Sequence, residues 1–126
     1  MYNEKVLDHF TNPRNVGDLP DADAVGVAAN PQCGDTMKLY LKVSEGIVTE
    51  AKWQARGCSA AIATSSMASE MVKGRSITEA GKLTNKAIAD MLGGLPPAKV
   101  HCSVLAADAI REAIRDYEDR KSRSGH

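Results

Sequence analysis

Three cysteines, one histidine and one aspartate carry the side chains best suited to chemistry in this sequence. Cys33 lies in a stretch of turn-forming residues with Asp35 two positions later, and Cys58 and Cys102 each precede a segment with helical patterning. His101 directly precedes Cys102. A helix N-terminus favours the thiolate, the form of cysteine that binds metals and attacks electrophiles. If the fold brings them together, these residues supply three sulfurs, a ring nitrogen and a carboxylate to one metal site.

The ligand types leave the identity of the metal open. Three cysteines and a histidine complete a tetrahedral zinc site, whereas thiolates with an occasional histidine hold iron–sulfur clusters. The spacing alone is weak evidence, because the cysteines are scattered and form no Cys-x-x-Cys pair. Three buried thiols that pack as small apolar residues explain it about as well. Taken singly, His101 would be a structural histidine, Asp35 a turn residue and Lys99 a surface lysine.

The composition is that of a soluble globular domain and argues against several classes of protein. The 126 residues include 16 Lys and Arg, 16 Asp and Glu, and 4% aromatic residues. A nucleic-acid binder would carry a basic excess and more aromatic side chains for stacking. The apolar stretches fall far short of the ~20 residues of a membrane span, and the polar N-terminus lacks a signal-peptide core. We expect a single domain over residues 1–126, a cytoplasmic location and reduced cysteines.

Alternating hydrophobicity predicts a hairpin in the middle of the chain. Apolar residues recur at every second position over residues 37–43 and again over the next run, where Ile47, Trp53 and others share one face. The three residues from Ser44 to Gly46 are expected to form the connecting loop. A weaker strand is expected over residues 24–29. The centre of the sheet is therefore antiparallel.

Helical patterning surrounds this sheet. The expected helices cover residues 2–10, 59–73, 84–92 and 103–121, with a short one after the capping box at 76–79. Tyr2, Val6 and Phe10 fall on one face of the first helix, and Pro96 with Pro97 predicts an extended segment. The sequence therefore predicts an α+β fold, in which helices pack on one face of a small antiparallel sheet of about three strands.

Four segments together resemble the IscU/NifU-type iron–sulfur cluster assembly scaffolds. The resemblance is collinear from residue 2 to about residue 117, and the segments occur in the family's order. It is therefore far more specific than the presence of three cysteines. The segments are Tyr2-Asn3-Glu4-Lys5-Val6-Leu7-Asp8-His9-Phe10 with Asn12-Pro13-Arg14-Asn15-Val16-Gly17, Cys33-Gly34-Asp35 with Met37-Lys38-Leu39, Gly57-Cys58-Ser59-Ala60-Ala61-Ile62-Ala63 with Ser65-Ser66, and Leu95-Pro96-Pro97-Ala98-Lys99-Val100-His101-Cys102-Ser103.

The resemblance implies a non-enzymatic scaffold on which a 2Fe–2S cluster is assembled and then passed to apo-proteins. By position, Cys33, Cys58 and Cys102 match the cysteine ligands of the family. His101 matches a histidine that can serve as a ligand, and Asp35 matches the aspartate that tunes cluster lability. Three thiolates with a weak fourth ligand suit a cluster that must be released, and zinc is the alternative occupant of the site in the isolated protein.

The same resemblance implies a set of protein partners. Sulfur would come as a persulfide from a cysteine desulfurase, with a frataxin-like iron donor, a ferredoxin and apo iron–sulfur acceptor proteins as further partners. The segment Leu95, Pro96, Pro97, Ala98 and Lys99 matches the site recognised by an Hsp70-type chaperone and its co-chaperone. No nucleic acid and no membrane are implied, and the chain is expected to be a monomer or a weak homo-oligomer.

Two other functions fit the same residues. In the related SufU branch, zinc holds the site and one cysteine accepts sulfur from the desulfurase, which would make this chain a sulfurtransferase. That branch carries an insertion before the third cysteine and lacks the preceding histidine, whereas here the stretch from Cys58 to Cys102 is compact and His101 is present. A structural zinc domain is the third alternative, and it would lose its metal only on unfolding. Ser59 stands where the family often has glycine, and we expect it to cap the following helix.

Overall fold

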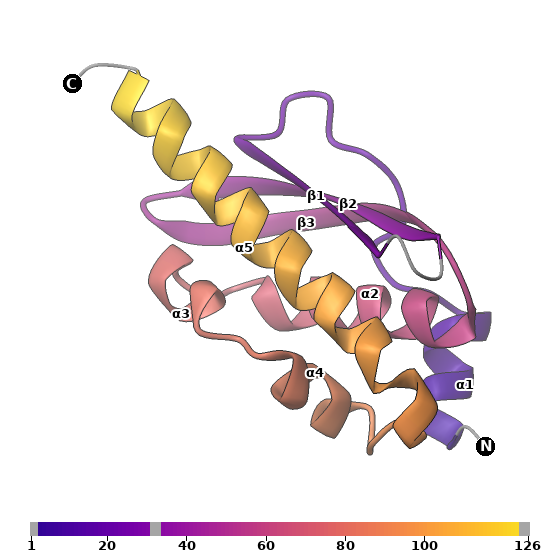
Figure 1. Ribbon diagram of the computed structural model, residues 1–126. Coiled ribbons are helices and arrows are strands. Elements are labelled where there is room, and N and C mark those ends of the chain that lie inside the picture. The colour runs from indigo at the N-terminus through magenta and orange to yellow at the C-terminus, as the bar shows by residue number, and fades with distance from the viewer. Residues whose placement is uncertain (1–2, 31–33, 124–126) are drawn as a thin grey trace.

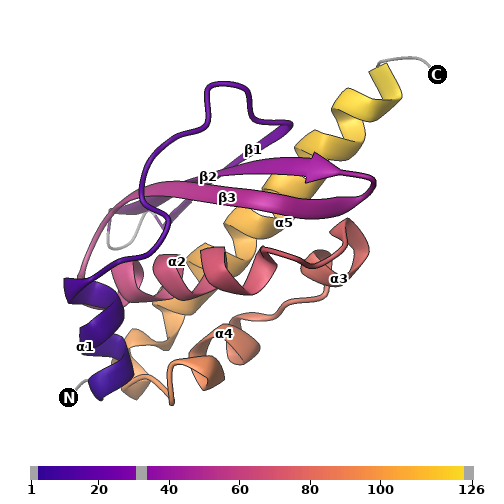
Figure 2. The same ribbon diagram turned by 180° about the vertical axis from the view of Figure 1, so that it is seen from behind.

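The structure, a computed structural model, describes residues 3–30 and 34–123 of the chain. Figure 1 and Figure 2 show two layers, with a small sheet on one side and the helices gathered against one of its faces. This arrangement confirms the predicted α+β fold. No described helix combines the length and the apolar character needed to cross a membrane.

Three antiparallel strands form the sheet in the order β1-β2-β3. Leu39 and Leu41 of β2 are fully buried between polar neighbours, and Trp53 of β3 is 2% exposed. The alternation predicted for the hairpin is thus the pattern of a sheet with one face in the core. The strands are β1 (Ala24–Asn30), β2 (Asp35–Ser44) and β3 (Ile47–Arg56).

The hairpin departs from expectation at its turn. Only Glu45 and Gly46 form the loop, and their φ angles of 53° and 77° are those of a two-residue turn of the type that matches strand twist. The β2–β3 pairing shifts by one residue close to this turn, which marks a β-bulge. As a result Val48 is fully buried and Ile47 is 39% exposed. The prediction that Ile47 faces the core is therefore wrong.

Two long helices cover the inner face of the sheet, α2 beneath β3 and α5 beneath β1 (Figure 1). Small residues let them approach closely. A Cβ on Gly26 of β1 would collide with the backbone of Ala109 and Ala113 in α5. All the predicted helices are present, and their bounds are α1 (Glu4–Thr11), α2 (Ser59–Val72), α3 (Ile77–Gly81), α4 (Asn85–Met91) and α5 (Val100–Arg123).

The first helix packs through a face different from the one predicted. Val6 and His9 are buried, whereas Phe10 is 41% exposed, so the prediction that Phe10 faces the core is wrong. The inward position is taken by a polar residue: Nδ1 of His9 lies 2.8 Å from Oγ of Ser66 in α2. Tyr2, the third residue of the predicted face, lies outside the described residues.

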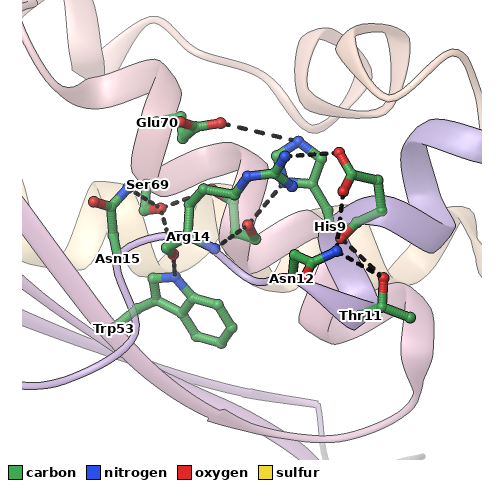
Figure 3. Close-up of polar contacts among 10 residues, drawn as sticks. His9, Thr11, Asn12, Arg14, Asn15, Trp53, Ser69 and Glu70 are labelled. Atoms are coloured by element: carbon green, nitrogen blue, oxygen red, sulfur yellow. Dashed lines mark hydrogen bonds and ion pairs between the residues drawn. The ribbon is translucent and has the colours of Figure 1, made fainter.

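Hydrogen bonds fasten the segment after α1 between α2 and β3, as Figure 3 shows. The indole Nε1 of Trp53 donates to the carbonyl oxygen of Arg14 at 2.6 Å, and the Arg14 amide donates to Ser66 Oγ at 2.9 Å. The backbone of Trp53 also pairs with Asn15 and Gly17. The N-terminal segment is thereby tied to both layers of the fold.

The segment before α5 is helical rather than extended. Pro97–Lys99 forms one turn of 3-10 helix, labelled η1, and α5 follows directly at Val100, three residues earlier than predicted. Pro96, with φ −55° and ψ 142°, keeps the predicted extended conformation. A proline at the first position of a helical turn loses no hydrogen bond, which explains why Pro97 begins η1 instead of excluding it.

Candidate metal centre

Asp35, Cys58 and Cys102 meet at one site, although they are far apart in the sequence. Their ligand atoms all lie within 4.8 Å of one another. The two sulfur atoms are 3.5 Å apart, and each is 4.0 Å from Oδ2 of Asp35. Two sulfurs bound to one tetrahedral metal at about 2.3 Å would lie about 3.8 Å apart. The spacing therefore fits side chains that share a metal.

Each of these residues stands at the end of a secondary-structure element. Asp35 is the first residue of β2, Cys58 is the N-cap of α2, and Cys102 lies in the first turn of α5. The prediction that Ser59 caps α2 is wrong, because Ser59 is already the first helical residue. Cys58 occupies the cap position and its side chain makes no capping hydrogen bond, so the thiol stays directed to the site.

Gly57 makes the approach of Asp35 possible. A Cβ at this position would lie 2.7 Å from both Cγ and Oδ1 of Asp35. Real Cβ atoms do not come that close to other atoms, so any larger residue would push the carboxylate away from the sulfurs. The absence of a side chain at Gly57 is thus part of how the site is built.

His101 stands at the edge of the site. Its side chain is exposed, and its Nε2 atom lies 3.7 Å from Sγ of Cys102. This places the imidazole within reach of a metal held by Cys102, on the solvent side. Cys33, the remaining predicted ligand, lies outside the described residues, so its role stays a prediction.

The electrostatics of Cys102 differ from those expected of a cysteine at a helix N-terminus. Burial raises the pKa of Cys102 to about 12, and the neighbouring Cys58 and Asp35 act in the same direction. The positive charge of Lys99 acts in the opposite direction. Burial thus opposes the effect of the helix N-terminus, which favours the thiolate. A bound cation would reverse this balance and release the thiol proton.

Sequence reasoning missed the residues that hold this site together. Thr64 Oγ1 lies 3.3 Å from the carbonyl oxygen of Cys102 and 3.1 Å from that of Ala61, so it links the first turn of α5 to α2. His9 and Ser66 fix α1 in a similar way. The signal was present in the hydroxyl-rich sequence Thr64-Ser65-Ser66 of α2.

The predicted chaperone-recognition segment is only partly exposed. Leu95, Pro96 and Lys99 are half-buried, and Pro97 is exposed. Leu95 packs against the core, so this side chain contributes to folding. The segment leads straight into the turn that carries His101 and Cys102, which places it beside the metal centre.

Comparison with known proteins identifies relatives over nearly the whole chain. The family model described as the NifU-like N terminal domain matches residues 1–124. An iron-sulfur cluster assembly scaffold protein IscU of Azotobacter vinelandii is 51% identical over 124 residues, covering 95% of this chain and 96% of the relative. A protein of the same description from Archaeoglobus fulgidus, IscU 1, is 60% identical over 117 residues, covering 93% of this chain and 76% of the relative.

Solved structures share the fold. The N-terminal part of a nitrogen-fixing NifU-like protein from Brucella abortus superimposes with a TM-score of 0.76 at 26% identity, covering 94% of each chain. A structure described as a putative iron-sulfur cluster assembly scaffold protein for the SUF system, from Fervidobacterium islandicum, gives a TM-score of 0.73 at 21% identity, covering 90% of this chain and 96% of that one. At 21% identity the second match shows the fold alone.

Proposed function

Since this chain belongs to the family of NifU-like N-terminal domains, we propose that it is a scaffold on which an iron–sulfur cluster is assembled and then transferred to other proteins. The observation that carries this proposal is the meeting of Asp35, Cys58 and Cys102 at one end of the fold. Relatives that match along nearly their whole length are named as assembly scaffold proteins, which supports the same function.

The cluster is the cargo of this site, and we propose that it is of the 2Fe–2S type. Cys58 and Cys102 would bind it together with Cys33, which is two residues from Asp35 in the sequence. His101 and Asp35 compete for the remaining position, His101 from the solvent side and Asp35 from the interior. Thiolates hold iron firmly, whereas a carboxylate or an exposed imidazole is exchanged more readily. Such a ligand set retains a cluster long enough to complete it and still lets it leave.

The second candidate is a zinc-dependent sulfur acceptor of the SufU type. Zinc would fit the same spacing of sulfurs, and the SUF-system structure shares the fold. The position of His101 favours the scaffold instead, because its Nε2 atom lies 3.7 Å from the Cys102 sulfur. The imidazole adds a nitrogen ligand to the three sulfurs and the carboxylate, and the SufU branch lacks the histidine at this position.

A scaffold needs donors of sulfur and acceptors of the cluster. We propose a cysteine desulfurase as the sulfur donor, with iron from a frataxin-like protein and electrons from a ferredoxin. Apo iron–sulfur proteins would take the cluster, assisted by an Hsp70-type chaperone with its co-chaperone at Leu95–Lys99. We propose that these steps take place in the cytoplasm.

Anaerobic reconstitution tests this function. The full chain is incubated with ferrous iron, cysteine and a cysteine desulfurase, and visible absorbance is followed together with iron and sulfide content. A scaffold acquires charge-transfer bands and equal amounts of iron and sulfide, and then passes both to an apo-ferredoxin. A colourless protein that carries zinc and a single persulfide would overturn the scaffold and establish the sulfur acceptor.

A further inference from the structure

A single hydroxyl group lies between the two helices that carry the sulfur ligands of the metal centre. Cys58 is the N-cap of α2, and Cys102 lies in the first turn of α5. The two helices pack against each other, and Thr64 of α2 is 0% exposed. Its Oγ1 atom is 3.3 Å from the carbonyl oxygen of Cys102 and 3.1 Å from that of Ala61. The hydroxyl has one proton to donate, so these carbonyl oxygens compete for it.

The other hydrogen bonds of Ala61 favour the acceptor in α5. A carbonyl oxygen has two lone pairs. In an α-helix the Ala61 carbonyl accepts the main-chain amide of Ser65, and Oγ of Ser65 donates to the same oxygen at 2.8 Å. Both lone pairs of Ala61 are therefore used within α2. The Cys102 carbonyl accepts one helical hydrogen bond within α5, which leaves its second lone pair for Thr64.

Burial strengthens the consequence of this contact. Thr64 is 0% exposed and Cys102 is 1% exposed, so bulk water cannot replace the hydrogen bond between them. A buried polar group that loses its partner costs more free energy than an exposed one. The hydroxyl therefore holds the main chain of Cys102 against α2, the helix whose N-cap is Cys58.

We propose that Thr64 is a positioning residue of the metal centre, whose hydroxyl holds Cys102 so that its sulfur lies beside that of Cys58 before a metal binds. The two sulfurs are 3.5 Å apart, close to the spacing on one tetrahedral metal. Groups that orient metal ligands from behind typically contribute a large part of metal affinity. This inference rests on the proposed function only through the metal centre, and it adds a residue that touches no metal.

Titration of the reduced full chain with Co²⁺ tests this role. Divalent metals share such sites, and a thiolate bound to Co²⁺ gives a charge-transfer absorbance that reports each sulfur bound. Thr64→Val removes the hydroxyl and keeps the shape of the side chain. We expect its affinity for Co²⁺ to fall about 10–100-fold. The absorbance per bound Co²⁺ should fall as well, because Cys102 binds less well, and Thr64→Ser should restore both properties.

Ser69→Ala is the matched control for a purely structural role. Ser69 is also fully buried in α2, and its hydroxyl donates to the carbonyl oxygen of Ser66 at 2.7 Å. Its loss should lower the free energy of unfolding in urea and leave both the Co²⁺ affinity and the absorbance per bound Co²⁺ unchanged. Circular dichroism verifies that each variant is folded under the conditions of the titration.

The unchanged chain offers a second test that does not depend on the folding of any variant. NMR should detect a slowly exchanging hydroxyl proton on Thr64, because this group is buried and hydrogen-bonded. A nuclear Overhauser effect should connect this proton to protons in the first turn of α5. A hydroxyl proton that is close only to protons of α2 would show that it donates to Ala61, and that result would overturn the proposal.

Two results of the titration would also overturn it. Equal Co²⁺ affinity of Thr64→Val and the unchanged chain would show that the hydroxyl does not position Cys102. An equal loss of affinity in Thr64→Ser and Thr64→Val would assign the effect to packing of the methyl group. Failure of the unchanged chain to bind Co²⁺ is a different outcome, which would contradict the metal centre itself and the proposed function together with this inference.

Discussion

The carboxylate of Asp35 occupies the space that a side chain on Gly57 would need. A Cβ added to Gly57 would lie 2.7 Å from Cγ of Asp35 and 2.9 Å from the Cβ of Ala61. Because of this vacancy, Asp35 is 5% exposed and lies 4.0 Å from each sulfur. A residue without a side chain thus determines how near the hard oxygen ligand comes to the two thiols.

Replacing Gly57 should therefore disturb both stability and the site. We expect Gly57→Ala to lower the free energy of unfolding by about 1–3 kcal/mol, the usual cost of forcing an extra methyl group into a packed region. In an Asp35→Ala background the same change should cost less, because one of its two clashes is gone. Urea unfolding of the four proteins measures this coupling. Strictly additive effects would show that the two residues do not compete for space.

Removing Asp35 alone should make the cluster persist. The carboxylate adds negative charge beside the sulfurs and is a hard donor that competes with softer ligands for iron. We expect Asp35→Ala to keep its visible absorbance longer in air or chelator and to transfer its cluster more slowly to an apo-ferredoxin. Asp90→Ala, which removes a carboxylate from the exposed surface of α4, is the matched control. If the visible absorbance of Asp35→Ala decays as fast as that of the unchanged protein, Asp35 does not control cluster lability and is only a turn residue.

Replacing any of the three cysteines should abolish cluster binding, but the replacements should differ in how much they lower the stability of the fold. We expect Cys33→Ala, Cys58→Ala and Cys102→Ala each to abolish stable assembly, measured as bound iron and sulfide. Cys102 is 1% exposed, so its replacement should also cost about 1 kcal/mol of unfolding free energy, whereas the half-buried Cys58 should cost less. Thermal melting by circular dichroism distinguishes these effects. Unchanged cluster content in any variant would remove that cysteine from the ligand set.

Lys99 should matter more for partner binding than for assembly. It lies two residues after the exposed Pro97, and its own side chain is half-buried. We expect Lys99→Ala to weaken binding to an Hsp70-type chaperone about tenfold in a titration, with cluster assembly retained. Lys86→Ala, which removes an exposed lysine paired with Asp90, is the control. Equal affinities of the Lys99 variant and the unchanged protein would contradict the assignment of this segment.

The fold was largely predictable because its strongest signals are local. The alternation around Leu39 and Leu41 reflects a sheet with one face in the core, and the two strands of the hairpin were found from this period, whereas α3 was found from its capping box. The burial of Val48 in place of Ile47 was not predictable, because no residue type in this part of the sequence indicates the β-bulge that causes it. The prediction of an extended segment at Pro97 failed for a different reason. Proline is unfavourable in the interior of a helix but is compatible with its first turn.

The metal centre was predictable only in part. Residue types marked Cys58 and Cys102 as ligands, but their spacing carried little information because the site is closed by contacts between distant elements. Periodicity gave no indication that these residues form one site, and the resemblance to a family of scaffolds was what placed them in one ligand set. The raised pKa of Cys102 could not be foreseen, since burial and then the neighbouring Cys58 are its main causes, and both depend on the complete fold.

The buried contact between α1 and α2 should make the protein sensitive to acid. Burial lowers the pKa of His9 below its ordinary value of 6.5, and the positive charge of Arg14 acts in the same direction, against smaller opposite effects of Glu70 and Asp8. The unfolded chain therefore binds this proton more readily than the folded one. The stability that the neutral ring provides is fully present above pH 6.5 and is lost as the pH falls toward the lower value in the folded state.

We therefore expect the free energy of unfolding, measured in urea at a series of pH values, to fall as the pH drops below 6.5. His9→Gln should flatten this decline, because an amide can still bond to Ser66 but does not titrate there. His101→Gln is the control: its imidazole is exposed, and its loss should leave the slope unchanged. Exchange of the α1 amides should quicken over the same pH range, since a charged His9 would be held next to Arg14 between two packed helices (Figure 3). An equal slope in the His9→Gln variant would assign the acid sensitivity to other groups and leave His9 a packing residue.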